Sequence, residues 1–303
     1  MNKRFLLGAI PLIILIMLLF TDSCTNPLWP KPPAGANQGI TLGRIPDITP
    51  GYSGPRVLSP IDDNVVIVIK GLPAGVTADL VLETDLEADY KGIDFDPDTN
   101  TLSYTNDDEP GYNGTMTIEF SVIMVSIPDS EPITLTIDVD RYDGRDEKLR
   151  IPVTHENIVR FNKYATDAET KADGLARHYK LMENVDLFEA TPLADGSNWT
   201  AIGTGPGAAF TGSFDGQGHK ISNLSIKKTT TNVPANNYQG MFGYINKGIV
   251  KNLGLAGGSI AGSTNVGGVA GYSMGCTIQN CIPQELLPAL TKSGVLWGIT
   301  IAL

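Results

Sequence analysis

The sequence is poor in cysteine, histidine and positive charge. It contains 3 Cys and 3 His in 303 residues, and its formal net charge is -11 at pH 7. Three cysteines cannot form a disulfide framework, and three widely spaced histidines do not form a dense metal cluster. An acidic chain without a basic patch repels the phosphate backbone. We therefore predict no metal site, no cofactor and no nucleic-acid partner.

An apolar run long enough to cross a membrane is also missing. The longest one, residues 5–20, has about 16 residues, fewer than the roughly 20 that a spanning helix needs, and it contains Pro11. Lys3 and Arg4 precede it, and small and polar residues follow it. This arrangement is typical of a secretory signal, so we predict a signal peptide at residues 1–23.

The signal ends in Thr21, Asp22, Ser23 and Cys24. These residues resemble the lipobox of bacterial lipoproteins. The resemblance implies that Cys24 is lipidated and becomes the new amino terminus, with enough acyl chains for stable anchoring. We therefore predict a membrane partner through the lipid anchor at Cys24, and a location in the bacterial cell envelope, at the outer membrane or cell surface. The alternative is ordinary secretion, with Cys24 as a free thiol.

Glycine and proline are abundant, with 33 and 20 residues. They are dense in residues 24–60, where no helical or strand period occurs, and this composition predicts an extended tether behind the lipidated Cys24. Further along the chain they separate short apolar segments. The sequence therefore predicts many turns and a mainly β protein.

Residues 61–145 show the alternation of antiparallel strands. Apolar residues at every second position, or β-branched runs, occur at residues 65–69, 80–82, 101–105, 115–126 and 132–139. Turn residues separate these segments, and we predict a small immunoglobulin-like β-sandwich. Asp94, Asp96, Asp98 and Asn100 alternate like half of a calcium loop, but the second half of that pattern is missing, so a hairpin turn is the preferred interpretation.

Residues 146–190 are predicted to be a linker with short helices. Residues 157–165 have apolar side chains at helical spacing, and residues 175–182 form a second such segment before a strand. His155 and His178 have no partner in a recognisable catalytic frame, so we interpret both as surface or strand residues.

Short motifs recur in residues 191–281. Asn223-Leu224, Asn252-Leu253 and Asn280-Cys281 follow one another at intervals of about 28 residues, and residues 240–244 return in residues 268–272 as a second Gly-x-x-Gly-Tyr unit. Each unit is too short to bury a face by itself, so we predict that the units stack as a partial right-handed parallel β-helix. Asparagine tolerates left-handed backbone, so we also expect the corner asparagines to stack in ladders.

The recurring segments carry a family resemblance. Residues 239–243 and 266–271 resemble the GLUG motif of bacterial surface proteins, and residues 210–226 resemble the segment that opens many such arrays. Proteins with this motif include adhesin-like surface proteins and non-catalytic flanks of secreted immunoglobulin A proteases. The resemblance implies a scaffold and transfers no catalytic residue. Asp215 is followed by glycine, so we interpret it as a turn residue.

Residues 282–303 depart from the repeats, since Leu, Pro and Trp stand where glycine and asparagine are expected. A frameshift after Cys281 would explain this tail, because re-reading the codons one base earlier can restore a repeat-like string. We therefore expect a truncated product. The alternative is a genuine short capping helix.

Taken together, these patterns predict a non-enzymatic cell-envelope lipoprotein. Its β-solenoid would display a surface for adhesion or structural interaction, with a host or cell-surface protein or a glycan as partner. The alternative is a remnant or accessory module of a surface carbohydrate-active enzyme or secreted protease. Paired carboxylates on one face would favour a glycosidase, whereas a face lined by glycine and asparagine would favour display.

Overall fold

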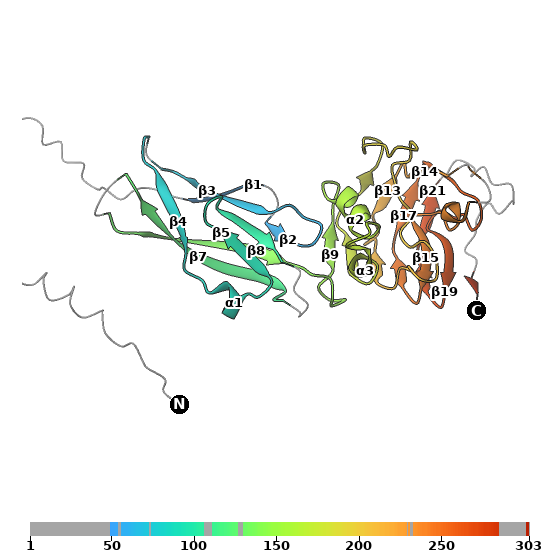
Figure 1. Ribbon diagram of the computed structural model, residues 1–303, viewed down its shortest axis with the longest axis horizontal. Coiled ribbons are helices and arrows are strands. Elements are labelled where there is room, and N and C mark those ends of the chain that lie inside the picture. The colour runs from blue at the N-terminus through green and yellow to red at the C-terminus, as the bar shows by residue number, and fades with distance from the viewer. Residues whose placement is uncertain are drawn as a thin grey trace, which may run out of the picture. The chain divides into compact units, whose positions relative to one another are not determined.

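The computed structural model describes residues 56–72, 74–105, 111–126, 130–228, 230 and 233–281, together with the backbone of strands at 49–53, 282–284 and 301–302. Strands dominate these segments and the helices are short (Figure 1). The mainly β prediction is confirmed. Two regions follow one another along the chain: a pair of antiparallel sheets up to residue 141, and a stack of parallel coils from residue 151 onward.

Two four-stranded sheets form the first region. One has the order β1 (Thr49–Ser53), β3 (Val65–Lys70), β6 (Thr101–Tyr104) and β5 (Ile93–Asp96), with antiparallel neighbours throughout. The other has the order β2 (Val57–Leu58), β8 (Ile133–Arg141), β7 (Gly114–Met124) and β4 (Ala78–Leu82), in which only the β2–β8 pair is parallel. Helix α1 (Leu86–Asp89) lies between β4 and β5 and is capped by the Asp85 carboxylate.

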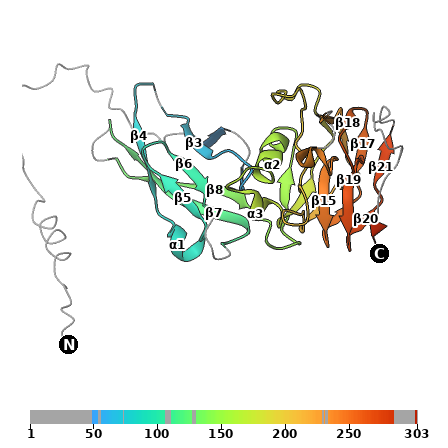
Figure 2. The ribbon, with the colours of Figure 1, turned by 45° about the vertical axis from the view of Figure 1, so that its right-hand side comes forward.

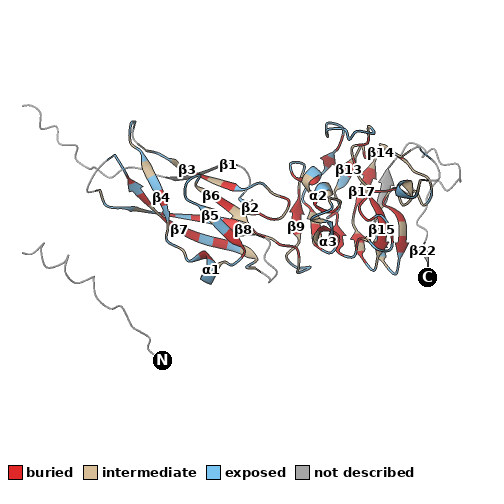
Figure 3. Ribbon diagram, viewed as in Figure 1, coloured by how far each residue is buried: buried red, intermediate tan, exposed pale blue. Residues whose placement is uncertain are grey.

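Side chains from both sheets share one hydrophobic core. In β7, Met116, Ile118 and Phe120 are fully buried, whereas the intervening Thr117 and Glu119 are exposed. Figure 3 shows this alternation as red and pale blue bands. The core also takes in residues of β2, β3, β4, β5, β6 and β8. The two sheets therefore pack face to face as a β-sandwich.

The predicted tether is too long at its carboxyl end. Thr49–Ser53 is a strand paired with β3, and Val57–Leu58 is a strand paired with β8. Pro50 and Gly51 hide the strand pattern in the sequence. β1 is an edge strand, where a proline is tolerated because one side of the backbone has no ladder partner.

Arg141 connects three loops of the sandwich from within. The residue is 1% exposed, and its guanidinium donates hydrogen bonds to the carbonyl oxygens of Gly92 at 2.8 Å, Tyr112 at 2.7 Å and Thr105 at 3.3 Å. It also lies 3.8 Å from the carboxylate of Asp143. Since a buried charge is stable only when it is paired and hydrogen-bonded, these four contacts hold the loops in place.

We expect Arg141→Met to lower the free energy of unfolding of the sandwich by about 3 to 5 kcal/mol, because it leaves the buried Asp143 charge and the loop carbonyls without their donor. The exposed Lys148→Met is the control and should change the free energy by less than about 0.5 kcal/mol. Urea unfolding followed by circular dichroism measures both. Equal midpoints for the two variants would contradict the role of Arg141.

The second region, residues 151–284, is built from parallel strands, and we call it the coil stack. Its first sheet has the order β20 (Thr277–Gln279), β16 (Ile249–Lys251), β12 (Ser213–Asp215), β10 (His178–Leu181) and β9 (Ile151–Val153). Every neighbouring pair in it is parallel. Hairpins join antiparallel strands, so they cannot connect these parallel neighbours. The chain instead leaves the sheet after each strand and returns one coil later to add the next strand beside it.

Three further parallel sheets complete the coils. The second contains β11 (Val185–Asp186), β13 (Lys220–Ser222), β17 (Gly254–Ala256) and β21 (Ile282–Gln284). β14 (Ser225–Lys227) pairs with β18 (Ser259–Ala261), and β15 (Phe242–Asn246) pairs with β19 (Ala270–Met274), which pairs with β22 (Ile301–Ala302). The 3-10 helix η1 (Pro234–Asn236) lies between β14 and β15. Figure 2 shows β15 beside β19 and β17 beside β21.

The parallel ladder begins inside the range that was predicted to be a linker. β9 precedes the helices α2 (Ile158–Tyr164) and α3 (Lys171–Gly174), and β10 follows them. The helix at residues 157–165 is confirmed by α2. The second helical segment, at residues 175–182, was wrong, because residues 178–181 form β10 between β9 and β12. The neighbouring strands β9 and β12 determine this pairing, and no pattern within residues 178–181 distinguishes a strand from a helix.

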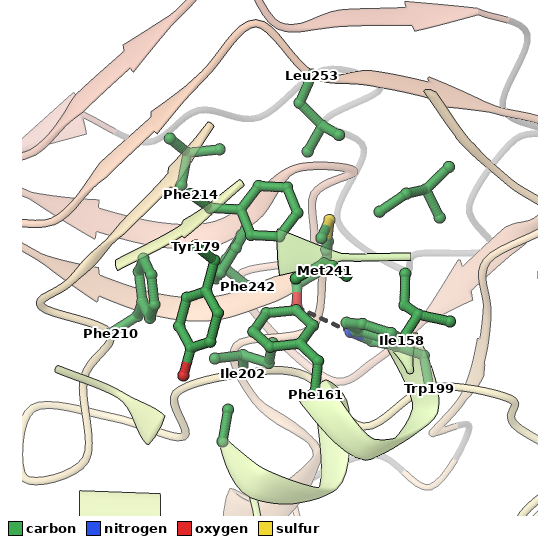
Figure 4. Packing of buried hydrophobic residues seen from close by; sticks show 14 of the residues in the cluster. Ile158, Phe161, Tyr179, Trp199, Ile202, Phe210, Phe214, Met241, Phe242 and Leu253 are labelled. Carbon is green, nitrogen blue, oxygen red and sulfur yellow. Dashed lines mark hydrogen bonds between the residues drawn. The ribbon is translucent and has the colours of Figure 1, made fainter. Parts of the chain in front are cut away.

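Aromatic side chains fill the first coils (Figure 4). The ring of Phe161, on α2, lies 4.6 Å from that of Tyr179 and 5.6 Å from that of Phe214. Trp199 is 1% exposed, and its Nε1 donates to the carbonyl oxygen of Met241 at 2.9 Å. α2 therefore contributes directly to the core at the start of the stack.

Two glycines of the Gly-x-x-Gly-Tyr units lie where backbone segments touch. A Cβ on Gly243 would lie 2.2 Å from the carbonyl oxygen of Gly203, and one on Gly271 would lie 2.4 Å from that of Asn265. No side chain fits at such distances, so both positions require glycine. The tyrosines that follow, Tyr244 and Tyr272, stack with ring centroids 4.8 Å apart.

The ladder also continues past Cys281. Strand β21 pairs in register with β17, although it lies at the start of the tail that departs from the repeat pattern. Main-chain hydrogen bonds suffice for this pairing, so it does not require a repeat-like sequence. Residues 285–300 and Leu303 lie outside the described residues.

Candidate functional site

The turns between the first and second parallel sheets form one corner of the coil stack, which we call the asparagine corner. It consists of residues 182–184, 216–219, 252–253 and 280–281. Asn252 and Asn280 have φ angles of 54° and 52°. Asparagine tolerates this left-handed backbone better than other side chains do. The predicted role of these asparagines at a corner is confirmed.

Side-chain amides connect successive turns of the asparagine corner. Asn280 Nδ2 donates to Asn252 Oδ1 at 3.1 Å, and Asn252 Nδ2 donates to Asp215 Oδ1 at 3.0 Å. Asp215 also accepts the backbone N–H of Gln217 at 3.0 Å and lies 3.4 Å from the ammonium group of Lys251. These contacts form the predicted ladder over three successive coils.

Asp215 is 5% exposed and belongs to this ladder and its turn. Burial raises its pKa, but the hydrogen bonds from Asn252 and Gln217 and the positive charge of Lys251 outweigh burial, so the pKa is lowered. A general acid in glycoside hydrolysis requires a raised pKa. Asp215 therefore lacks the protonation state for that role, and the turn interpretation fits its contacts.

A groove lies at the asparagine corner. Its volume is about 490 Å³, and it is lined by Asn184, Gly218, Lys220, Asn252, Leu253, Gly254 and Asn280. The lining thus combines carboxamides, glycines and one leucine with a single charged side chain. The carboxylate pair that would indicate a glycosidase is absent from these lining residues.

A second ladder lies one corner further along each coil. Asn223 has a φ of 60°, and its Nδ2 donates to Asp186 Oδ1 at 2.8 Å. Asn198 Oδ1 accepts the backbone N–H of Ser225 at 2.7 Å, and Asn198 Nδ2 donates to the carbonyl oxygen of Asn223 at 2.8 Å. Carboxamides therefore support both ends of the short second-sheet strands.

The placement of Asn223 corrects the predicted repeat. Asn252 and Asn280 are structural equivalents, 28 residues apart. Asn223 is not equivalent to them, because Ser222 pairs with Ala256 and Asn223 therefore lies beside Gly257. Asn223 follows the second-sheet strand β13, whereas Asn252 and Asn280 precede the second-sheet strands β17 and β21.

The histidines do not form an accessible catalytic pair. The backbone N–H of His155 donates to Glu183. His178 Nδ1 lies 2.9 Å from Ser213 Oγ, but Ser213 is only 1% exposed, and burial lowers the pKa of His178. A serine nucleophile must reach its substrate, so this contact matches the interpretation of His178 as a strand residue.

The aspartate-rich segment of the sandwich is a turn, as predicted. Asp96 accepts the backbone N–H of Asp98 at 2.9 Å and the hydroxyl of Thr99 at 2.7 Å, and Asn100 has a φ of 52°. Asp94 bonds the backbone N–H of Phe95. Within the described segments, no group of three or more His, Cys, Asp and Glu side chains is placed to hold a metal ion.

The predicted lipidation residue, Cys24, lies outside the described residues. Among the helices of the described segments, none combines the length and apolar character needed to cross a membrane. Cys276 and Cys281 are half-buried free thiols. No pattern in the sequence marks Asn184, Lys220 or Asn198 as site residues, because only the register between coils brings them to the two corners.

Comparison with known proteins finds distant similarity. No protein-family model and no solved structure matches the chain. The chain is 27% identical over 301 residues to Halomucin of Haloquadratum walsbyi (strain DSM 16790 / HBSQ001). The match covers 87% of this chain and 3% of Halomucin, so the chain spans only a small part of the length of that relative.

We expect Asn252→Ala to destabilise the coil stack by about 2 to 4 kcal/mol, because it removes two ladder hydrogen bonds and replaces asparagine with alanine, which tolerates left-handed backbone less well. Asn252→Gly keeps the backbone relaxed and should cost about 1 to 2 kcal/mol, from the lost hydrogen bonds. Urea unfolding of both variants measures the difference. Equal stability of the two variants would show that the φ of 54° imposes no strain.

Acid should weaken the coil stack. The ammonium group of Lys228 lowers the pKa of Asp195 to about 2, and Asn223 lowers that of Asp186. Because the ordinary value is 3.8, the stabilisation from both carboxylates is complete above that pH. The part from Asp195 is lost as the pH falls toward about 2, and the part from Asp186 is lost as the pH falls through its lowered pKa. Burial raises the pKa of Asp62, so protonation of this carboxylate at low pH favours the folded state and opposes the effect of Asp195 and Asp186.

We therefore expect the melting temperature to fall over this pH range, and Asp195→Asn to flatten the pH dependence. Calorimetry of wild type and variant at several pH values measures both. Parallel curves would exclude a contribution from the Lys228–Asp195 pair.

Proposed function

We propose that this protein is a non-enzymatic cell-surface protein whose coil stack presents a polar face for adhesion or structural interaction. The observation that carries the proposal is the asparagine corner, where carboxamides and glycines line the groove without a pair of carboxylates. The side-chain amides of Asn252 and Asn280 are hydrogen-bonded in the ladder, so they form a fixed surface and are not placed as reactive groups. The similarity to part of Halomucin is compatible with a structural role at the cell surface.

The resemblance of residues 239–243 and 266–271 to the GLUG motif supports an adhesin-like scaffold. Gly243 and Gly271 provide a physical basis for such a motif, since the backbone contacts at these positions exclude a side chain. On this proposal the repeats form a right-handed parallel β-helix, and the sandwich before them is an immunoglobulin-like spacer. The partner would be a protein or a glycan.

We also propose that the chain is held at the cell envelope by a lipid on Cys24. The basic residues, apolar run and cysteine at the amino terminus support export and acylation. The relative comes from an archaeon, so the proposal is limited to the cell surface and does not assign a bacterial outer membrane.

An accessory module of a carbohydrate-active enzyme is the second candidate. The groove of about 490 Å³ favours it, because its volume lies within the range of small-ligand sites. The two candidates differ in one measurable property, since an enzyme would cleave the saccharide that it binds.

The lipid anchor can be tested in intact cells of the natural host. We expect the wild-type chain to incorporate an alkyne-labelled fatty acid and to be degraded by protease added outside the cells. Cys24→Ser should lose the label and appear in the medium, because one signal for anchoring is gone. Cys276→Ser is a matched cysteine control and should keep both properties. Equal labelling of the Cys24 and Cys276 variants, or protection of the wild type from protease, would refute the proposal.

A further inference from the structure

We infer that the groove at the asparagine corner binds a neutral oligosaccharide lying along the axis of the coil stack. This inference rests on the proposed function, because a chain displayed at the cell surface meets extracellular glycans. It goes further by assigning one site and one class of ligand.

Unequal turn lengths create the groove. The turn at residues 216–219 has four residues, whereas those at 252–253 and 280–281 have two. The longer turn carries Gly218, at a φ of 83°, and leads to Lys220, and both residues line the groove. The shorter turns carry Asn252 and Asn280, which line it as well. The backbone N–H of Gly218 donates to the carbonyl oxygen of Asn252 at 2.8 Å, so turns of different length lie next to each other at the groove.

The polar groups in the groove match the chemistry of sugar hydroxyls. A carboxamide both donates and accepts hydrogen bonds, as a hydroxyl does. Asn184 Oδ1 accepts the backbone N–H of Lys220 at 3.0 Å, and its Nδ2 has no hydrogen-bond partner among the described residues. Asn280 is exposed at the other end of the ladder. Both amides can therefore bond a ligand, because the backbone N–H of Lys220 orients Asn184 and the ladder bond to Asn252 orients Asn280.

The spacing of the coils favours a repeating ligand. Asn184, Lys220, Asn252 and Asn280 come from four successive coils. Neighbouring parallel strands lie about 4.8 Å apart, so polar groups recur along the groove at about that interval. A chain of linked sugar rings offers hydroxyl groups periodically along its length, which a single small metabolite does not.

Charge selects a neutral saccharide. Lys220 is the one charged side chain that lines the groove, and it disfavours a cationic ligand. Asp215 and Lys251 lie 3.4 Å apart at this corner and offset each other's charge, and the whole chain has a net charge of -11. A polyanionic glycan would be repelled by this field.

The test uses the full chain and two neutral probes, cellotetraose and chitotetraose. Saturation-transfer NMR detects binding, and isothermal calorimetry gives the affinity. Asn184→Ala and Asn280→Gly each remove one amide of the groove, and we expect each to weaken binding about fivefold, the equivalent of one hydrogen bond. Asn265→Gly is the matched control, because Asn265 has a φ of 54° but does not line the groove. Its affinity should remain that of the wild type.

Two results would overturn the inference. One is the failure of both tetrasaccharides to bind at concentrations up to about 10 mM. The other is binding that is weakened equally by Asn265→Gly, or is unchanged in both groove variants, since the ligand would then lie elsewhere. Cleavage of a bound probe would support the site but favour the enzyme candidate. Failure here leaves the cell-surface proposal intact, because that proposal is tested separately by protease accessibility and labelling at Cys24.

Discussion

The in-register stacking of parallel coils is the constraint on which the rest of the structure depends. Phe214 pairs with Val250, and Val250 pairs with Ile278, so the inward side chains of each coil cover those of the next. A shift of one residue would reverse every side chain between core and solvent. The close backbone contacts at Gly243 and Gly271 and the left-handed turns at Asn252 and Asn280 are needed to maintain this register.

The sandwich is stabilised in a different way. Its two longest strands, β7 and β8, alternate clearly, and both sheets bury one core between them, so no repeat is needed. Its connecting loops converge on the guanidinium of Arg141, which bonds carbonyl oxygens far apart in sequence. In the coil stack, short strands are supported instead by side-chain amides at the corners. In each region, side chains therefore hold the segments between strands: Arg141 bonds the loop carbonyls of the sandwich, and side-chain amides connect the turns of the coil stack.

Sequence reasoning succeeded where a local pattern is long or specific. The β-branched run at residues 65–69 and the alternation at residues 115–126 predict β3 and β7 closely. The missed strand β9 has three residues, which is too short for a period, and β1 contains a proline that an edge strand tolerates. His178–Leu181 has an apolar spacing that fits a helix as well as a strand, and the pairing with β9 and β12 determines the outcome.

The candidate site shows the same division. The left-handed asparagines and their ladder were predictable, because asparagine is suited to that backbone and recurs in the sequence. The groove was not, because Asn184, Lys220 and Asn252 are far apart in the sequence and come together only through the register between coils. The spacing of 28 residues holds between the last two coils, and it fails for Asn223 because this residue lies after the second-sheet strand and not at the asparagine corner.

In the coil stack the first-sheet strands keep nearly the same length, whereas the connecting turns differ in length from coil to coil. Strands of the first sheet stay at three or four residues, whereas the segment between β14 and β15 is much longer than that between β18 and β19. Insertions at corners leave the ladder and the aromatic interior unchanged. Such a scaffold can acquire new recognition loops one corner at a time, so related chains can diverge in what they contact while they keep the same interior.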